Sequence, residues 1–207
     1  MIGIVDFGSG NTRSVLRAFD AVGADAVLVR EAAALDGFER FVLPGVGAAG
    51  SAASVLRATG LWDAVGARAR DGVPLLGICL GAQLLLDGSD EGDTPGFGLI
   101  AGRCRAFPAP ADGGPRVVPH VGWNAVELPS GQRADAYFVH GYWLAPADPA
   151  IVRGTTEVDG FRFASVLRSG SITATQFHPE KSGQFGRALL AAFAAGRLDA
   201  AREPAWT

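Results

Sequence analysis

The chain has 207 residues, of which 48% are hydrophobic and 19% charged, a composition that suits a globular protein and excludes disordered, collagen-like and disulfide-scaffold classes. Its formal net charge is −3, and it lacks a run of like charge, so we expect no nucleic-acid partner. The longest nearly apolar stretch, residues 73–86, is too short to cross a bilayer, and the first residues do not resemble a signal peptide; we therefore expect a cytoplasmic protein without membrane contact.

Strands and helices are predicted to alternate through the first half of the chain. Short apolar runs indicate strands at 2–7, 26–29, 41–43 and 74–79. Helical spacing of apolar residues indicates helices at 12–22, 50–58, 61–71 and 82–86. Because strands that alternate with helices form a parallel sheet covered on both faces, this half predicts an α/β fold.

The second half has a different pattern. Strand-like runs are expected at 99–107, 116–123, 137–139, 151–155, 161–167 and 172–177. Pro108, Pro110, Gly113, Gly114 and Pro115 predict a surface loop between the first two. An alanine-rich helix is expected at 182–195, followed by a tail at 202–207. With no linker and no repeat in view, we expect residues 1–207 to form a single α/β domain with an antiparallel β extension.

A glycine-x-nucleophile-x-glycine turn lies between the expected strand 74–79 and the helix after it, in the sequence GICLG at 77–81. Glycines on both sides allow a strained turn that lifts the nucleophile, here Cys79, above the sheet. The N-terminus of the following helix favours a thiolate over a thiol. The alternative is a buried structural cysteine in a glycine-rich strand end.

A histidine and a glutamate close the last expected strand, in the sequence QFHPE at 176–180. In an extended segment, which Pro179 favours, His178 and Glu180 share a face, so the carboxylate can orient the imidazole as a base. Two alternatives are a surface pair and a metal site. Three scattered histidines, and two cysteines without a CxxC motif, argue against any metal site, and no cofactor is expected.

An oxyanion hole would complete a cysteine, histidine and acid constellation. The turn LPGVG at 43–47 carries two glycines that let the backbone direct an N–H toward the sulfur, and the Leu80 N–H directly follows the nucleophile. A plain turn is the alternative for this segment. A dinucleotide site at Gly8–Gly10 fails because Arg13 stands where the third glycine is needed.

With these motifs placed, the chain resembles the class I (triad) glutamine amidotransferases. GICLGAQLL at 77–85 is similar to the nucleophile motif of that family, and QFHPEKS at 176–182 to its base and acid motif. Four further segments resemble the glutaminase subunits of imidazole glycerol phosphate synthases, which serve histidine biosynthesis: DFGSGN at 6–11, PGVG at 44–47, PHVGWN at 119–124 and FVHGYW at 138–143. The resemblance implies a three-layer, flavodoxin-like fold with a mostly parallel central sheet.

The resemblance also implies roles for individual residues. Cys79 would be the nucleophile, His178 the base and Glu180 its orienting acid, with the oxyanion held by the N–H groups of Val46 and Leu80. The residues implied to bind L-glutamine are Gly47, Gln83, Glu91 and Tyr142. Glu91 is hard to assign because Asp90 and Asp93 stand beside it.

The implied partner is a (β/α)8-barrel cyclase that forms a heterodimer with this chain and uses the ammonia released from glutamine. The residues implied to lie at that interface are Asn11, His120, Trp123 and Lys181. We further hypothesise that the Val46 N–H is turned away from the sulfur until the cyclase binds its ligand. The alternatives are the glutaminase subunit of another amidotransferase, a stand-alone cysteine hydrolase or DJ-1-like protein, and a catalytically idle interaction subunit.

Overall fold

The computed structural model describes residues 1–8, 10–109 and 118–198 of the chain. Its centre is a parallel sheet in the order β2-β1-β3-β4-β13. The strands are β1 (Ile2–Val5), β2 (Ala26–Val29), β3 (Arg40–Leu43), β4 (Leu75–Ile78) and β13 (Ile172–Thr175). All residues of β1, β4 and β13 are buried, as expected for parallel strands that are covered on both faces.

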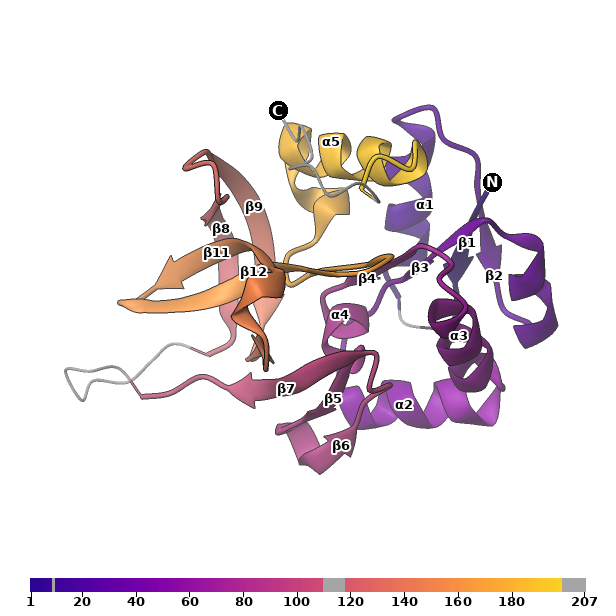
Figure 1. Ribbon diagram of the computed structural model, residues 1–207, viewed down its shortest axis with the longest axis horizontal. Helices are drawn as coiled ribbons and strands as arrows, with labels where there is room; N and C mark the ends of the chain where they lie inside the picture. The colour runs from indigo at the N-terminus through magenta and orange to yellow at the C-terminus, as the bar shows by residue number, and fades with distance from the viewer. Residues whose placement is uncertain (9, 110–117, 199–207) are drawn as a thin grey trace.

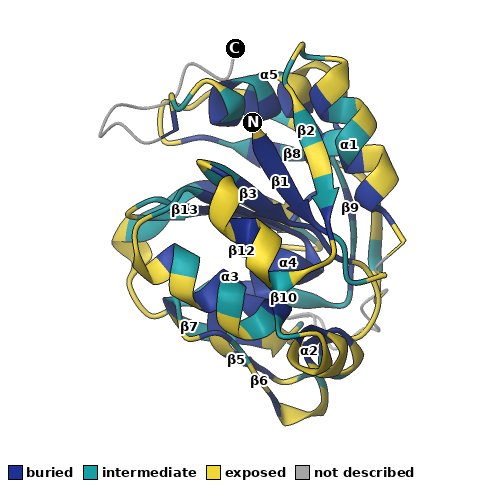
Figure 2. Ribbon diagram, turned by 90° about the vertical axis from the view of Figure 1, so that its right-hand side faces the viewer, coloured by how far each residue is buried: buried dark blue, intermediate teal, exposed yellow. Residues whose placement is uncertain are grey.

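Helices cover this parallel sheet on both sides (Figure 1). One face packs on α1 (Thr12–Asp20) and α5 (Gly183–Ala194), and the other on α2 (Ala49–Ala58) and α3 (Leu61–Arg70). Because side chains alternate along a strand, Ile4 contributes to the first core and Val5 to the second. In Figure 2, β1 and β3 are buried between the two helical layers. The expected three-layer α/β fold is confirmed.

Antiparallel strands extend the sheet beyond β13 and bring the chain back over its carboxyl edge. They are β7 (Ile100–Ala106), β8 (His120–Glu127), β9 (Arg133–His140), β10 (Tyr142–Pro146), β11 (Val152–Val158) and β12 (Phe161–Ser169). At the edge, the short β5 (Leu86–Ser89) runs parallel to β7 and pairs with β6 (Thr94–Pro95). Short helical turns are η1 (Ala32–Gly37), η2 (Glu91–Asp93), η3 (Pro149–Ile151) and η4 (Pro179–Lys181), and α4 spans Leu80–Leu84. The expected antiparallel extension is confirmed.

Several details of the expected pattern of strands and helices were wrong. The helix expected at 82–86 starts at Leu80 and ends at Leu84, because Leu86 pairs with Ile100 and begins β5. Strand β10 was not expected at all, since Gly141 and Pro146 interrupt its apolar pattern. The loop residues at 110–115, the first residues of the run at 116–123 and the tail at 202–207 lie outside the described residues.

Two glycines allow the backbone to approach closely around the carboxyl edge of the sheet. A Cβ atom on Gly81 would overlap the Leu43 carbonyl oxygen, so α4 can lie directly against the end of β3. A Cβ atom on Gly186 would overlap the Pro179 carbonyl oxygen, so α5 packs directly under the turn that carries Glu180. Among the helices of the described chain, the longest is α5 with 12 residues, and none has the length and hydropathy to span a membrane.

Candidate active site

Cys79 lies on a sharp turn between β4 and α4. Its backbone has φ 52° and ψ −109°, a left-handed conformation that is strained for any residue with a Cβ atom. The Cys79 N–H donates to the Thr175 carbonyl oxygen at 2.8 Å, which ties the turn to β13. The sulfur lies 3.7 Å from the Val139 carbonyl oxygen of β9. The turn thus presents the thiol at the carboxyl edge of the sheet, as the GICLG motif predicts.

His178 and Glu180 lie beside this turn because β13 runs parallel to β4, with Thr175 opposite Ile78. The His178 Nδ1–H donates to Glu180 Oε1 at 2.7 Å, and neither side chain is exposed to solvent. The expected extended geometry of this segment was wrong: residues 179–181 form a turn, closed by the Lys181 N–H donating to the His178 carbonyl oxygen at 3.0 Å. It is this turn that folds the carboxylate back onto the ring.

The environment of His178 favours the imidazolium. Burial opposes the charge, but the nearby Cys79 sulfur and the Glu180 carboxylate outweigh the effect of burial, and together they raise the pKa of His178 to about 10. The second ring nitrogen, Nε2, is buried and has no hydrogen-bond partner among the described residues. A protonated Nε2 is therefore available for a group that enters next to the sulfur.

We expect the pKa of His178 to fall when Cys79 is replaced by alanine, because the sulfur provides the largest effect that raises it. NMR titration of the ring protons measures this pKa directly. The pKa values of His120 and His140 are lowered by burial, so a histidine that titrates above pH 6.5 identifies His178. An unchanged titration in the alanine variant would contradict the proximity of ring and sulfur.

The raised pKa of His178 also makes the stability of the fold depend on pH. Because its pKa is higher in the folded chain than the ordinary value of 6.5, the imidazolium stabilises the fold below about pH 6.5. That contribution is lost as the pH rises through about 10. The free energy of unfolding should therefore depend less on pH in this range in the alanine variant than in the unchanged chain.

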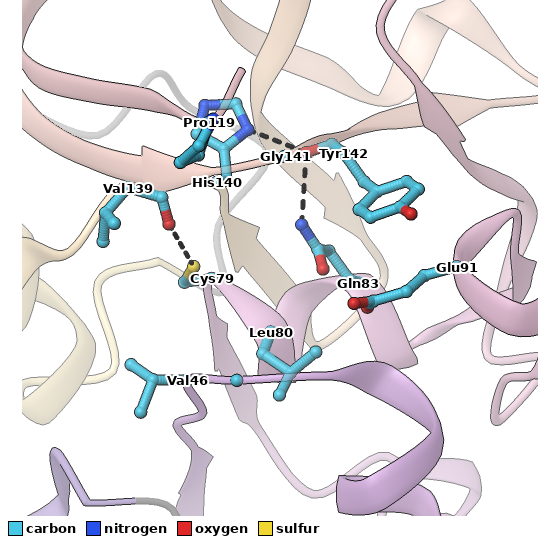
Figure 3. Close-up of a pocket in the computed structure, with 11 residues that line it drawn as sticks. Val46, Cys79, Leu80, Gln83, Glu91, Pro119, Val139, His140, Gly141 and Tyr142 are labelled. Carbon is cyan, nitrogen blue, oxygen red and sulfur yellow. Dashed lines mark hydrogen bonds between the residues drawn. The ribbon is translucent and has the colours of Figure 1, made fainter.

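A cavity of about 320 Å³ opens next to the sulfur. We call it the Cys79 pocket; it is lined by Val46, Gly47, Cys79, Leu80, Gln83, Glu91, Pro119, Val139, His140, Gly141 and Tyr142. Figure 3 shows Gln83, Glu91 and Tyr142 gathered on one side of it. The structure thus brings all four residues expected to bind substrate to one cavity with the expected nucleophile. His178 and Glu180 are not among the residues that line it, and their side chains are buried.

Sequence reasoning missed several residues of the pocket. Pro119, Val139 and His140 line it; they belong to the segments 119–124 and 138–143 that resemble the family, but no role in the pocket was expected for them. Gln176 was also missed: its amide nitrogen lies 4.0 Å from the Cys79 sulfur.

Polar contacts hold the side chains of the pocket in place. The Gln83 Nε2 group donates to the Tyr142 carbonyl oxygen at 3.2 Å and to Gln176 Oε1 at 3.4 Å. Glu91 Oε2 accepts from the Ala49 N–H at 2.8 Å. Asp90 and Asp93 both pair with Arg103, and neither lines the pocket. Of these three acidic neighbours, Glu91 is the one whose carboxylate can meet a ligand there.

The expected oxyanion donors are not both free in this structure. The Leu80 N–H donates to the Gly45 carbonyl oxygen at 3.3 Å. The peptide bond between Gly45 and Val46 is trans, so its N–H points opposite to its C=O. The Val46 N–H is therefore turned away from the Leu80 N–H, and the backbone itself fills the place where an oxyanion would bind. A flip of this peptide would open the hole.

The four residues expected at a partner interface divide into two kinds. Trp123 is 59% exposed and its ring packs edge-on against Tyr137, over which Lys181 also lies. Asn11 is instead buried and donates to Glu180 Oε1 at 3.1 Å. His120 is partly buried, and its Nδ1 lies 3.0 Å from His140 Nε2. Trp123 and Lys181 thus lie at the surface, while Asn11 contacts Glu180 and His120 contacts His140 in the interior.

Comparison with known proteins agrees with this geometry. The family model for class I glutamine amidotransferases matches residues 3–195. This chain belongs to the class I glutamine amidotransferases. Solved structures with the same fold include a glutamine amidotransferase (TM-score 0.71, 20% identity, 95% of each chain covered) and PurLQS from Thermotoga maritima (TM-score 0.71, 18% identity, 95% of this chain and 98% of that one).

Curated relatives of this amidotransferase share more of its sequence. The imidazole glycerol phosphate synthase subunit HisH of Nitratidesulfovibrio vulgaris (strain Miyazaki F) is 41% identical, over 98% of this chain and the whole of the relative. HisH of Geobacillus thermodenitrificans is 40% identical, over 92% of this chain and 93% of the relative. HisH of Synechocystis sp. is 36% identical, over 93% of this chain and 94% of the relative.

Proposed function

We propose that this amidotransferase is the glutaminase subunit of an imidazole glycerol phosphate synthase, which hydrolyses L-glutamine to glutamate and ammonia for histidine biosynthesis. The observation that carries the proposal is the identity of 36–42% to HisH subunits over more than nine-tenths of the chain. The Cys79 pocket supports it, because nucleophile, base and acid meet beside a cavity with polar side chains. We propose that residues 1–207 act as one amidotransferase domain in the cytoplasm.

The reaction begins with attack by the Cys79 thiolate on the side-chain carboxamide carbon of glutamine. A C–S bond forms, and the carbonyl oxygen becomes an oxyanion that the N–H groups of Val46 and Leu80 stabilise once the Gly45–Val46 peptide has flipped. The His178 imidazolium then donates its Nε2 proton to the amide nitrogen. The C–N bond breaks, ammonia leaves, and a γ-glutamyl thioester with Cys79 remains.

Water completes the reaction. Neutral His178 takes a proton from water, and the hydroxide adds to the thioester carbon. Collapse of this second oxyanion breaks the C–S bond, releases glutamate and restores the thiolate and the imidazolium. Glu180 holds Nδ1 throughout, so Nε2 is the nitrogen that exchanges protons with the reactants.

We assign recognition of the glutamine head group to the side of the Cys79 pocket where Gln83, Glu91 and Tyr142 lie. The Glu91 carboxylate complements an α-ammonium group. Both Nε2 hydrogens of Gln83 are used by protein acceptors, which leaves its amide oxygen to accept from the same ammonium. Gly47 and Tyr142 complete the wall around the bound amino acid.

The partner in this proposal is a (β/α)8-barrel cyclase, bound as a heterodimer at the surface of Trp123 and Lys181, with Asn11 and His120 behind it. Ammonia released into water at neutral pH becomes ammonium, which has no lone pair for attack. A glutaminase that serves a second enzyme therefore has to deliver ammonia through a sheltered route. The filled oxyanion hole fits this need, because it keeps turnover low until the partner is engaged.

The test is glutamate release from L-glutamine by the purified chain, alone and with an imidazole glycerol phosphate synthase cyclase carrying its ribotide ligand. We expect slow release from the isolated chain and an increase of about 10²-fold or more with the liganded cyclase, as expected when an oxyanion donor becomes available. Full turnover without the partner would refute the gating of the hole. No stimulation by the cyclase, with glutamine still turned over, would favour another amidotransferase or a stand-alone hydrolase.

A further inference from the structure

His120 and His140 form a hydrogen-bonded chain that leads from strand β8 to the Cys79 pocket. His140 Nδ1 lies 2.7 Å from the Tyr142 carbonyl oxygen, the same oxygen that accepts from Gln83 (Figure 3). His140 Nε2 lies 3.0 Å from His120 Nδ1. His120 Nε2 in turn lies 3.5 Å from the side-chain nitrogen of Asn124.

The partners decide which nitrogen of each ring carries the proton. A carbonyl oxygen only accepts, so His140 donates from Nδ1 to Tyr142 and its Nε2 is the acceptor. His120 must then donate from Nδ1, and its Nε2 accepts from the Asn124 amide. In this series of hydrogen bonds, every donor therefore points toward the Cys79 pocket, from Asn124 through both imidazole rings to Tyr142.

The surroundings of the two rings keep them neutral. Aromatic rings of Phe107, Phe138 and Phe163 pack around them. Burial lowers the pKa of His140 to about 3 and also lowers the pKa of His120. Neutral rings each have one donor and one acceptor, which is what the chain of hydrogen bonds requires.

We propose that His120 and His140 are positioning residues that hold the Tyr142 carbonyl oxygen, and through it the Gln83 amide, in the geometry that binds the head group of the substrate. Neither imidazole is used by the proposed reaction. Asn124 and His120 belong to β8, the strand on which Trp123 is exposed. The series of hydrogen bonds therefore also connects the proposed partner surface to the substrate-binding residues. The inference rests on the proposed function, because the substrate is taken to be glutamine.

The test compares His120→Phe with His120→Asn in the complex with a saturating cyclase. Phenylalanine keeps an aromatic ring but removes the donor, so His140 Nε2 is left buried without its partner. We expect the KM for glutamine to rise about fivefold with little change in kcat, as for the loss of one hydrogen bond in a network. Asparagine places an amide N–H near the position of Nδ1 and should restore much of the KM.

Two further variants separate this role from a structural one. His140→Asn keeps a donor for the Tyr142 carbonyl oxygen but removes Nε2, so adding His120→Phe to it should change KM no further. Val121→Ala alters an exposed neighbour on the same strand and should leave KM unchanged. Equal effects of Val121→Ala and His120→Phe would show a general disturbance of β8 and overturn the inference.

A spectroscopic measurement tests the hydrogen bonds between the two histidines without the need to measure enzyme activity. Nitrogen-15 NMR of the imidazole rings should show both His120 and His140 protonated at Nδ1 and unprotonated at Nε2. A proton on Nε2 of either ring would overturn the inference. If the unchanged complex fails to hydrolyse glutamine, the proposed function fails; if it does hydrolyse glutamine and His120→Phe leaves KM unchanged, the positioning role fails.

Discussion

Replacing Cys79 with alanine is expected to abolish glutamate release. No other cysteine lines the Cys79 pocket, and without a thiolate no thioester can form. Removing the nucleophile of a cooperating triad lowers kcat by roughly 10⁴- to 10⁶-fold. Because the side chain is small and adjoins a cavity, the variant should remain folded. Glutamate release in the presence of the liganded cyclase measures the effect.

Cys104 provides the matched control, since it is the second of the two cysteines and is fully buried away from the pocket. Burial raises the pKa of the Cys104 thiol, so this cysteine stays protonated and is no reactive thiolate. Cys104→Ala should therefore lower the free energy of unfolding slightly and leave kcat near that of the unchanged chain. Comparable loss of activity in both variants would contradict the assignment of Cys79 as the nucleophile.

Substitutions at Val46 are expected to change glutamate release in opposite directions. Val46→Pro removes the N–H that the flipped peptide would offer, so partner-stimulated turnover should fall by about 10²- to 10³-fold. Val46→Gly should raise turnover by the isolated chain. Val46 is not among the residues with positive φ, and a peptide flip reverses that sign. A positive φ costs a β-branched residue about 1–3 kcal/mol, and glycine does not have this cost. We therefore expect turnover by the isolated chain to rise roughly tenfold in Val46→Gly.

Val46→Ala separates the two explanations for a gain in activity. Alanine shortens the side chain as glycine does but retains a Cβ atom, so it keeps most of the cost of positive φ. Turnover by the isolated chain should therefore stay close to its original value in Val46→Ala. Equal activation by alanine and glycine would attribute the gain to lost side-chain packing and not to the peptide flip.

The sequence predicted the parallel half of the fold because each strand there is a short apolar run followed by a turn. It failed at Leu86, where a continuous run of leucines fits a helix and a buried strand equally well. It also failed at β10, whose pairing with β7 is decided by residues far away in the chain. Local pattern identifies strands that fold next to helices, but not antiparallel strands that are defined by their neighbours.

The candidate site shows the same division. The Cys79 turn and the His178–Glu180 pair were readable because each occupies a few consecutive residues. Asn11 was expected at a surface, yet it bonds to Glu180, a contact between the two ends of the chain that no local pattern reveals. The pairing of His120 with His140 depends on the register of β8 and β9, in which these two residues are opposite each other.

The close packing at Gly81 and Gly186 has a consequence for how the specificity of this enzyme can change. Both glycines adjoin backbone atoms, so no side chain can be introduced behind the nucleophile or under the acid without moving the catalytic groups. A Cβ atom on Gly141, by contrast, would meet only a Val118 methyl group, at an ordinary van der Waals distance of 3.5 Å. Laboratory evolution toward other amides should therefore accumulate its substitutions on the β9–β10 wall and leave the catalytic wall untouched.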